Sequence, residues 1–154
     1  MATALIRNAR ILDTSQEEAS DPSDIYIEDG EIREIAREGG IGVSGEMTID
    51  AGGRFALPGL IDCHAHPFLA DTNLARLNEV PLTLMTARAG NILRNMLMRG
   101  FTTIRDAAGG DWGIKQAVEE DEVIGPRMFI AGRALSQTGG HGDSRRKTET
   151  SHAC

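Results

Sequence analysis

From residue 58 onward, short apolar segments alternate with segments of helical periodicity, and this alternation constrains the fold more than any other feature. Apolar runs predict strands at residues 59–63, 101–106 and 127–131. The segments between them that have the spacing of amphipathic helices are residues 83–99 and 111–120. Strands separated by helices pair in parallel through crossovers. The sequence therefore predicts a β-α-β-α-β unit of the α/β class, in either a doubly wound sheet or a (β/α)8 barrel.

Local signals set the expected ends of the helices. Gly100 follows the longer helical segment and suits its C-terminal cap, and Asp111 is the expected N-cap of the second helix. A further short helix is expected over residues 71–79, capped by Asp71 or Thr72. Along the longer helix we expect an apolar stripe of Leu84, Ala87, Ile92, Leu93, Met96 and Leu97. Residues 59–63 form a compact apolar run after Pro58, which is consistent with a buried strand.

The first 57 residues predict short strands and turns, and so a separate β unit. Residues 4–12 are expected to form one or two strands, further strands are expected at residues 25–27, 47–50 and 54–57, and a polar loop is expected at residues 13–24. Asp29-Gly30 between two alternating runs predicts a β-hairpin, and the spacing of three between Ile32 and Ile35 implies a bulge in its return strand. The expected domains are therefore residues 1–57 and residues 58–154.

Composition and charge exclude several classes of function. No run of 18 apolar residues is present, so no membrane span is expected, and Arg7 interrupts the N-terminal apolar stretch, which argues against a signal peptide. Residues 1–50 hold 12 acidic and 4 basic residues, which argues against nucleic-acid binding there. Two cysteines are too few for a disulfide framework. We expect a cytoplasmic protein without nucleic-acid or membrane partners.

The segment Asp62-Cys63-His64-Ala65-His66, at the end of the first predicted strand of the α/β unit, carries the candidate chemistry. Because side chains alternate along a strand, Asp62, His64 and His66 are expected on one face. Two imidazoles on one face can reach a single divalent ion, and parallel α/β folds place active sites at the carboxyl ends of their strands. The alternative is a pair of hydrogen-bonded histidines in a strand-end loop.

Three segments resemble the amidohydrolase superfamily. Residues 56–69, ALPGLIDCHAHPFL, resemble its first-strand signature, and residues 100–110, GFTTIRDAAGG, resemble its second-strand segment. Residues 125–143, GPRMFIAGRALSQTGGHGD, are similar to the third-strand segment of the prolidase-like and imidazolonepropionase-related branch. The three matches follow the family's order and spacing.

The resemblance implies the first three strands of a (β/α)8 TIM barrel, preceded by strands of a small β-sandwich. It also implies one or two divalent metal ions, usually zinc, and hydrolysis of carbon–nitrogen bonds by a metal-activated water. The implied substrate is a small-molecule amide or a dipeptide-like compound. Carried onto this sequence, the family's first two metal ligands are His64 and His66.

Three further residues are candidates for supporting roles. By its place in the resemblance, His141 contacts the substrate or supports the ligands; the alternative is an exposed loop histidine. Asp106 either supports the site by hydrogen bonding or caps the following turn. Asp62 is expected to be a supporting or structural group rather than a ligand.

Other ligands of the family have no match here. The family uses a lysine on its fourth strand, histidines on the fifth and sixth strands, and an aspartate on the eighth. Lys115 falls in a predicted helix and Lys147 in the terminal loop, and His152 matches no ligand position. The expectation is therefore a truncated N-terminal portion, inactive alone, whose unpaired strand edge favours self-association.

The sequence also admits two alternatives to this hydrolase. The first is a catalytically inactive scaffold that retains the amidohydrolase fold for assembly, and the second is a small two-layer α/β binding domain unrelated to the barrel. The presence of both His64 and His66 argues against the first. The three ordered matches argue against the second.

Overall fold

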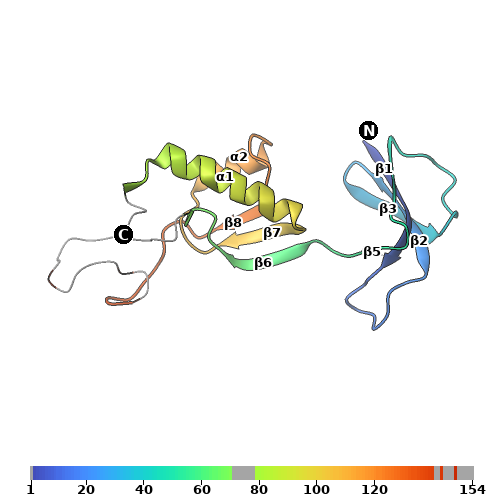
Figure 1. Cartoon of the computed structure of the whole chain (residues 1–154), viewed down its shortest axis with the longest axis horizontal. Coiled ribbons are helices and arrows are strands. Elements are labelled where there is room, and N and C mark those ends of the chain that lie inside the picture. Colours follow the sequence, from blue (N-terminus) through green and yellow to red (C-terminus); the bar gives the residue numbers. More distant parts are fainter. Residues whose placement is uncertain (1, 71–78, 141–142, 144–147, 149–154) are drawn as a thin grey trace. The chain divides into compact units, whose positions relative to one another are not determined.

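The computed structural model describes residues 2–70, 79–140, 143 and 148. The chain divides into two compact units, Met1–Pro58 and Gly59–Cys154. Each unit has its own sheet, as Figure 1 shows. Within the described ranges, no helix is long and apolar enough to cross a membrane.

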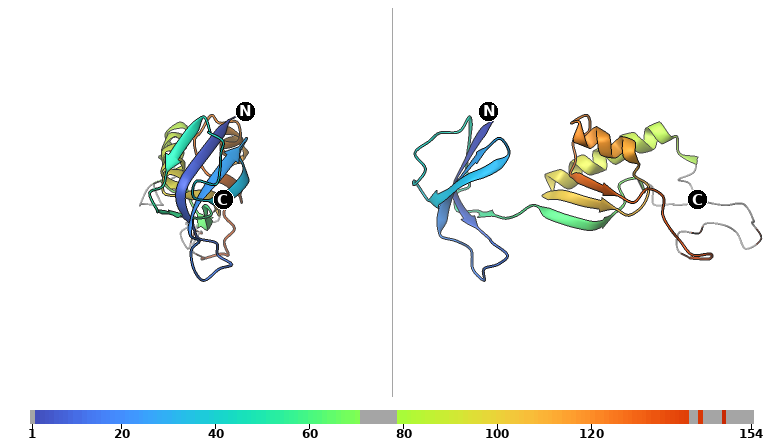
Figure 2. Two further views of the ribbon diagram at one scale, coloured as in Figure 1. Left: turned by 90° about the vertical axis from the view of Figure 1, so that its right-hand side faces the viewer. Right: turned by 180° about the vertical axis from the view of Figure 1, so that it is seen from behind.

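The first unit is a five-stranded sheet in the described residues. Its strands are β1 (Thr3–Ile11), β2 (Pro22–Glu28), β3 (Glu31–Arg37), β4 (Met47–Asp50) and β5 (Phe55–Ala56). The order is β3-β2-β1-β4, and β5 also pairs with β1. The first three strands are antiparallel, whereas β4 and β5 run parallel to β1 (Figure 2).

The predicted hairpin between β2 and β3 is confirmed. Asp29 and Gly30 both have positive φ, 49° and 80°, which a two-residue hairpin turn of type I′ requires. The expected bulge is present, because Ile27 pairs with Ile32 while Tyr26 pairs with Glu34. The predicted loop over residues 13–24 is too long, because β2 already begins at Pro22. Proline is tolerated as the first residue of a strand, where its missing N–H group breaks no ladder hydrogen bond.

The second unit confirms the predicted β-α-β-α-β order. It contains β6 (Leu60–Ala65), α1 (Leu82–Met98), β7 (Phe101–Asp106), α2 (Trp112–Glu119) and β8 (Arg127–Ile130). The three strands are parallel in the order β6-β7-β8, and both helices cover one face (Figures 1 and 2). Asp111 caps α2 by accepting a hydrogen bond from Ile114 N, as expected. Gly100, with φ of 92°, follows α1 at the predicted cap. Most of the short helix expected over residues 71–79 lies outside the described residues.

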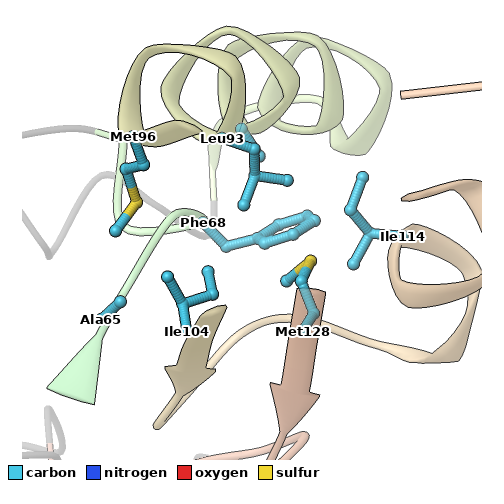
Figure 3. Close-up of a cluster of buried hydrophobic side chains, with 8 residues drawn as sticks. Ala65, Phe68, Leu93, Met96, Ile104, Ile114 and Met128 are labelled. Atoms are coloured by element: carbon cyan, nitrogen blue, oxygen red, sulfur yellow. The ribbon is translucent and has the colours of Figure 1, made fainter. Parts of the chain in front are cut away.

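The core of this unit lies between the helices and the covered face of the sheet. Figure 3 shows Leu93 of α1 and Ile104 of β7, both fully buried, beside Phe68. The expected stripe on α1 is correct at Leu93 and Met96 but wrong at Leu84 and Ala87, which are exposed. Packing against the core starts near Met85, so the first turn of α1 lies outside the core.

The prediction that residues 59–63 form a buried strand is also wrong. In β6, Leu60 is 44% exposed and Ile61 is 66% exposed. β6 is one of the two outer strands of the described three-stranded sheet, and the helices cover only one face of that sheet. The apolar run therefore forms a strand, but no described residue covers its apolar side chains at Leu60 and Ile61.

Replacing Leu93 with alanine is expected to destabilise the second unit by about 2–5 kcal/mol, because it empties a fully buried site in close-packed surroundings. The measurement is denaturant unfolding followed by circular dichroism at 222 nm, which reports on α1 and α2. The control is Leu82→Ala on the same helix, where the side chain is 68% exposed. Equal destabilisation by the two variants would contradict the assigned core.

Candidate active site

Two imidazole rings converge at the carboxyl end of β6. The Nε2 atoms of His64 and His66 lie 3.0 Å apart, and the ring centroids are 4.9 Å apart with an interplanar angle of 77°. Both residues follow the apolar run of β6, and His66 lies one residue past its end. The pair therefore occupies the edge of the sheet where parallel α/β proteins hold their active sites.

A β-bulge, rather than strict alternation, directs His64. Asp62 pairs with Ile104 and Ala65 pairs with Asp106, so Cys63 and His64 both lie opposite one residue of β7. The rings of His64 and His66 converge, as expected, although the strand that carries them is irregular between Asp62 and Ala65. The bulge inserts an extra residue and re-aims a side chain, and it turns Ala65 into the core while His64 stays exposed.

The other ring nitrogen of His66 faces the turn after β7. Its Nδ1 atom lies 3.5 Å from the carbonyl oxygen of Ala108 and 4.0 Å from Oδ1 of Asp106. If Nδ1–H donates to this carbonyl, Nε2 keeps its lone pair and points toward His64. Backbone carbonyls and carboxylates commonly fix the tautomer of a metal-binding histidine in this way.

Asp106 organises that turn from a fully buried position. Its carboxylate accepts a hydrogen bond from Ala108 N at 3.1 Å and another from Gly110 N. Burial raises the pKa of Asp106, while the two backbone N–H groups and nearby His66 oppose the rise. The carboxylate thus caps the turn, one of the two roles that the sequence left open. It lies 4.0 Å from His66 Nδ1, beyond hydrogen-bond distance, so its supporting role toward the site stays a prediction.

The close approach of the Asp106 carboxylate explains why the turn ends in a glycine, Gly110. A Cβ atom at this position would lie 2.3 Å from Oδ2 of Asp106, so a larger residue would displace the carboxylate. The sequence signal for this turn is the Asp-Ala-Ala-Gly-Gly run after β7. The carbonyl group of Ala108 could not be identified from the sequence, because any residue supplies a backbone oxygen.

The histidine pair fits one divalent ion as part of its ligand set. Two nitrogens bound to one zinc at about 2.0–2.1 Å lie about 2.8–3.4 Å apart when the bond angle is between a right angle and the tetrahedral angle. The observed separation of 3.0 Å falls in this range. Among the described residues, no group of three or more His, Cys, Asp or Glu side chains could hold a metal. His141 lies outside the described residues.

Comparison with known proteins gives a family. Residues 55–154 match the model of the Amidohydrolase family. Curated relatives include ochratoxinase from Aspergillus niger, 36% identical over 91 residues (56% of this chain and 19% of the relative). The dihydroorotase of Trichlorobacter lovleyi is 36% identical over 101 residues (65% and 20%), and the imidazolonepropionase of Salmonella typhi is 36% identical over 76 residues (47% and 19%). The chain thus spans about a fifth of the length of these relatives.

Solved structures agree with this result. A crystal structure of an amidohydrolase matches with 45% identity and a TM-score of 0.88, covering 99% of this chain and 37% of that one. A prolidase complexed with N-methylphosphonate-L-proline matches with 36% identity and a TM-score of 0.85, with the same coverage. The resemblance to prolidase-like and imidazolonepropionase-related proteins is thereby confirmed. The chain belongs to the amidohydrolase family.

Proposed function

We propose that His64 and His66 bind a divalent metal ion, with zinc the first candidate, in an enzyme that hydrolyses carbon–nitrogen bonds. The observation that carries the proposal is the 3.0 Å approach of the two Nε2 atoms at the carboxyl end of β6. Imidazole pairs also suit iron, cobalt and nickel. Zinc is preferred because its catalytic sites are commonly built from histidines.

The proposed substrate is a small-molecule amide or a dipeptide-like compound. Support comes from the relatives, which include the prolidase with a bound proline phosphonate and ochratoxinase. A structure of a Xaa-Pro dipeptidase, at 24% identity, supports the fold alone. This chain covers 37% of the prolidase structure. Hydrolysis of such substrates by an enzyme that contains this chain is therefore part of the proposal.

We also propose that the parallel β6-β7-β8 sheet is the first part of a (β/α)8 barrel. The parallel order and the one-sided helical cover are the features that support it. In the same proposal, Met1–Pro58 supplies strands of a small β-sandwich. The further strands of the barrel would then cover apolar residues of β6 that are exposed here, such as Ile61.

A bound divalent ion would lower the pKa of a water and polarise the scissile carbonyl. The residues of this chain have separate tasks around it. His64 and His66 would hold the ion through Nε2, and the Ala108 carbonyl would keep the His66 proton on Nδ1. Asp106 would fix the turn that presents this carbonyl. His141 would contact the substrate, as the family resemblance implies.

Two imidazoles are fewer than the three protein ligands of a usual catalytic zinc site. We therefore propose that further ligands come from residues outside those described, and that the 154-residue chain alone has little or no hydrolase activity.

The chain is expected to bind about one zinc ion, while releasing little or no proline from Xaa-Pro dipeptides, because two histidines can hold an ion but complete no catalytic set. Competition with a chromophoric zinc chelator measures binding, and an amine-release assay measures hydrolysis. Absence of zinc binding would overturn the metal proposal. Rapid zinc-dependent hydrolysis would overturn the proposal that the chain alone has little activity.

A further inference from the structure

The peptide group between Cys63 and His64 is held on both sides by side chains. The Arg105 Nε–H group donates a hydrogen bond of 2.6 Å to the carbonyl oxygen of Cys63. On the other side, the His64 N–H group donates a hydrogen bond of 2.9 Å to Oδ1 of Asp62. Both polar atoms of one peptide group therefore have side-chain partners.

This peptide group lies in the bulge of β6. Cys63 and His64 together oppose Arg105, and a bulge locally disrupts the regular ladder between strands. The side chains of Asp62 and Arg105 thus supply the hydrogen bonds at a point where backbone pairing is irregular. The Asp62 bond lies within β6, whereas the Arg105 bond links β7 to β6.

The orientation of this peptide plane controls where the His64 ring points. The plane sets the position of the His64 Cα atom and the direction of its Cα–Cβ bond. Cys63 and His64 are both exposed, so burial in the core does not fix their conformation. The two hydrogen bonds therefore restrain the backbone that carries the His64 ring, in addition to the contact of this ring with His66.

We propose that Asp62 and Arg105 clamp the Cys63–His64 peptide group and thereby position His64 for metal binding. Both are positioning residues, which act through His64 and need not touch the ion. The inference rests on the proposed function, because it concerns the affinity of the same histidine pair for metal. It extends that function by assigning a role to Arg105.

The charge of Arg105 makes the clamp testable. A guanidinium group repels a nearby divalent cation. If Arg105 acted only through its charge, replacing it with a neutral residue would raise the metal affinity. Removal of a clamping hydrogen bond would lower the affinity, as loss of groups that orient metal ligands usually does. The two effects have opposite signs.

The first experiment compares Arg105→Met with Arg105→Gln in the full chain. Both substitutions remove the charge, but glutamine keeps an N–H donor at the same number of bonds from Cα as Arg105 Nε. We expect zinc affinity to fall about 10–100-fold in Arg105→Met and to stay near wild type in Arg105→Gln. Asp62→Leu and Asp62→Asn are the matching pair for the hydrogen bond to the His64 N–H group. Leucine removes the acceptor oxygen, whereas asparagine keeps it.

The second readout uses the metal-free chain. Exchange of the His64 amide hydrogen is expected to be roughly two- to tenfold faster in Asp62→Leu and Arg105→Met, the change that corresponds to losing one hydrogen bond. Arg127→Met, an arginine of β8 that pairs with Thr103 rather than with Arg105, is the control. Circular dichroism at 222 nm verifies that α1 and α2 are retained in every variant.

The outcomes separate the two proposals. Wild-type chain that binds no zinc would overturn the proposed function, while the exchange measurement would still test the clamp. A rise of zinc affinity in both Arg105→Met and Arg105→Gln would show that Arg105 acts through its charge, and equal affinity in the two variants would show that its N–H donor has no role. Either result would overturn the clamp. Unchanged exchange of the His64 amide in Asp62→Leu would overturn it as well.

Discussion

Replacing either His64 or His66 with alanine is expected to lower the zinc affinity of the chain more than about 100-fold, beyond the loss caused by removing a group that only orients a ligand. The reason is geometric. The two Nε2 atoms lie 3.0 Å apart, close enough to share one ion, and each variant leaves a single imidazole at the end of β6. Competition with a zinc chelator gives the affinity of each variant.

Two controls show whether a loss of zinc affinity comes from loss of a ligand: the stability of the His64 variant and the zinc affinity of a variant at another histidine. His64 is exposed, so His64→Ala is expected to change the free energy of unfolding by no more than about 0.5 kcal/mol. His152→Ala, outside the described residues and without a counterpart among the family ligands, is expected to retain wild-type zinc affinity. A loss of affinity in His152→Ala equal to that in His64→Ala would contradict the assigned pair.

Replacing Asp106 with alanine is expected to destabilise the second unit by about 2–5 kcal/mol, because it leaves two backbone N–H groups of a buried turn without their acceptor. Those groups belong to Ala108 and Gly110. The same variant is expected to weaken zinc binding about 10–100-fold, because the turn presents the Ala108 carbonyl to His66. Denaturant unfolding at 222 nm and chelator competition measure the two effects.

Asp111→Ala is the matched control for Asp106. Asp111 lies in the same connection between β7 and α2 and caps the helix, so its loss is expected to cost about 1 kcal/mol. It has no contact with His66 among the hydrogen bonds described, and zinc affinity should be unchanged. If Asp106→Ala reduced stability but left zinc affinity at the wild-type value, Asp106 would be a structural residue with no role toward His66.

The elements of the second unit could be predicted because their local signals agree. Asp111 at the start of α2, Gly100 after α1 and the apolar periods between them all indicate the same boundaries, and the parallel order follows from the alternation. The hairpin at Asp29-Gly30 could likewise be predicted from its local sequence. In each case, residues close in sequence determine the conformation.

The details of the candidate site depend on contacts between distant residues, which is why they escaped prediction. The β6 bulge is visible only in the pairing of β6 with β7, and the partner of His66 Nδ1 is a backbone oxygen 42 residues away. The exposure of Ile61 was missed for a related reason. An apolar run indicates a strand that is covered, but it does not tell which residues cover it.

The most direct test of the account is a zinc titration followed through the ring nitrogens of the four histidines by 15N NMR. One equivalent of zinc is expected to shift Nε2 of His64 and His66 together, while the proton of His66 stays on Nδ1, where it faces the Ala108 carbonyl. Shifts confined to His141 and His152, or coordination of His66 through Nδ1, would contradict the assignment of this pair as the metal site.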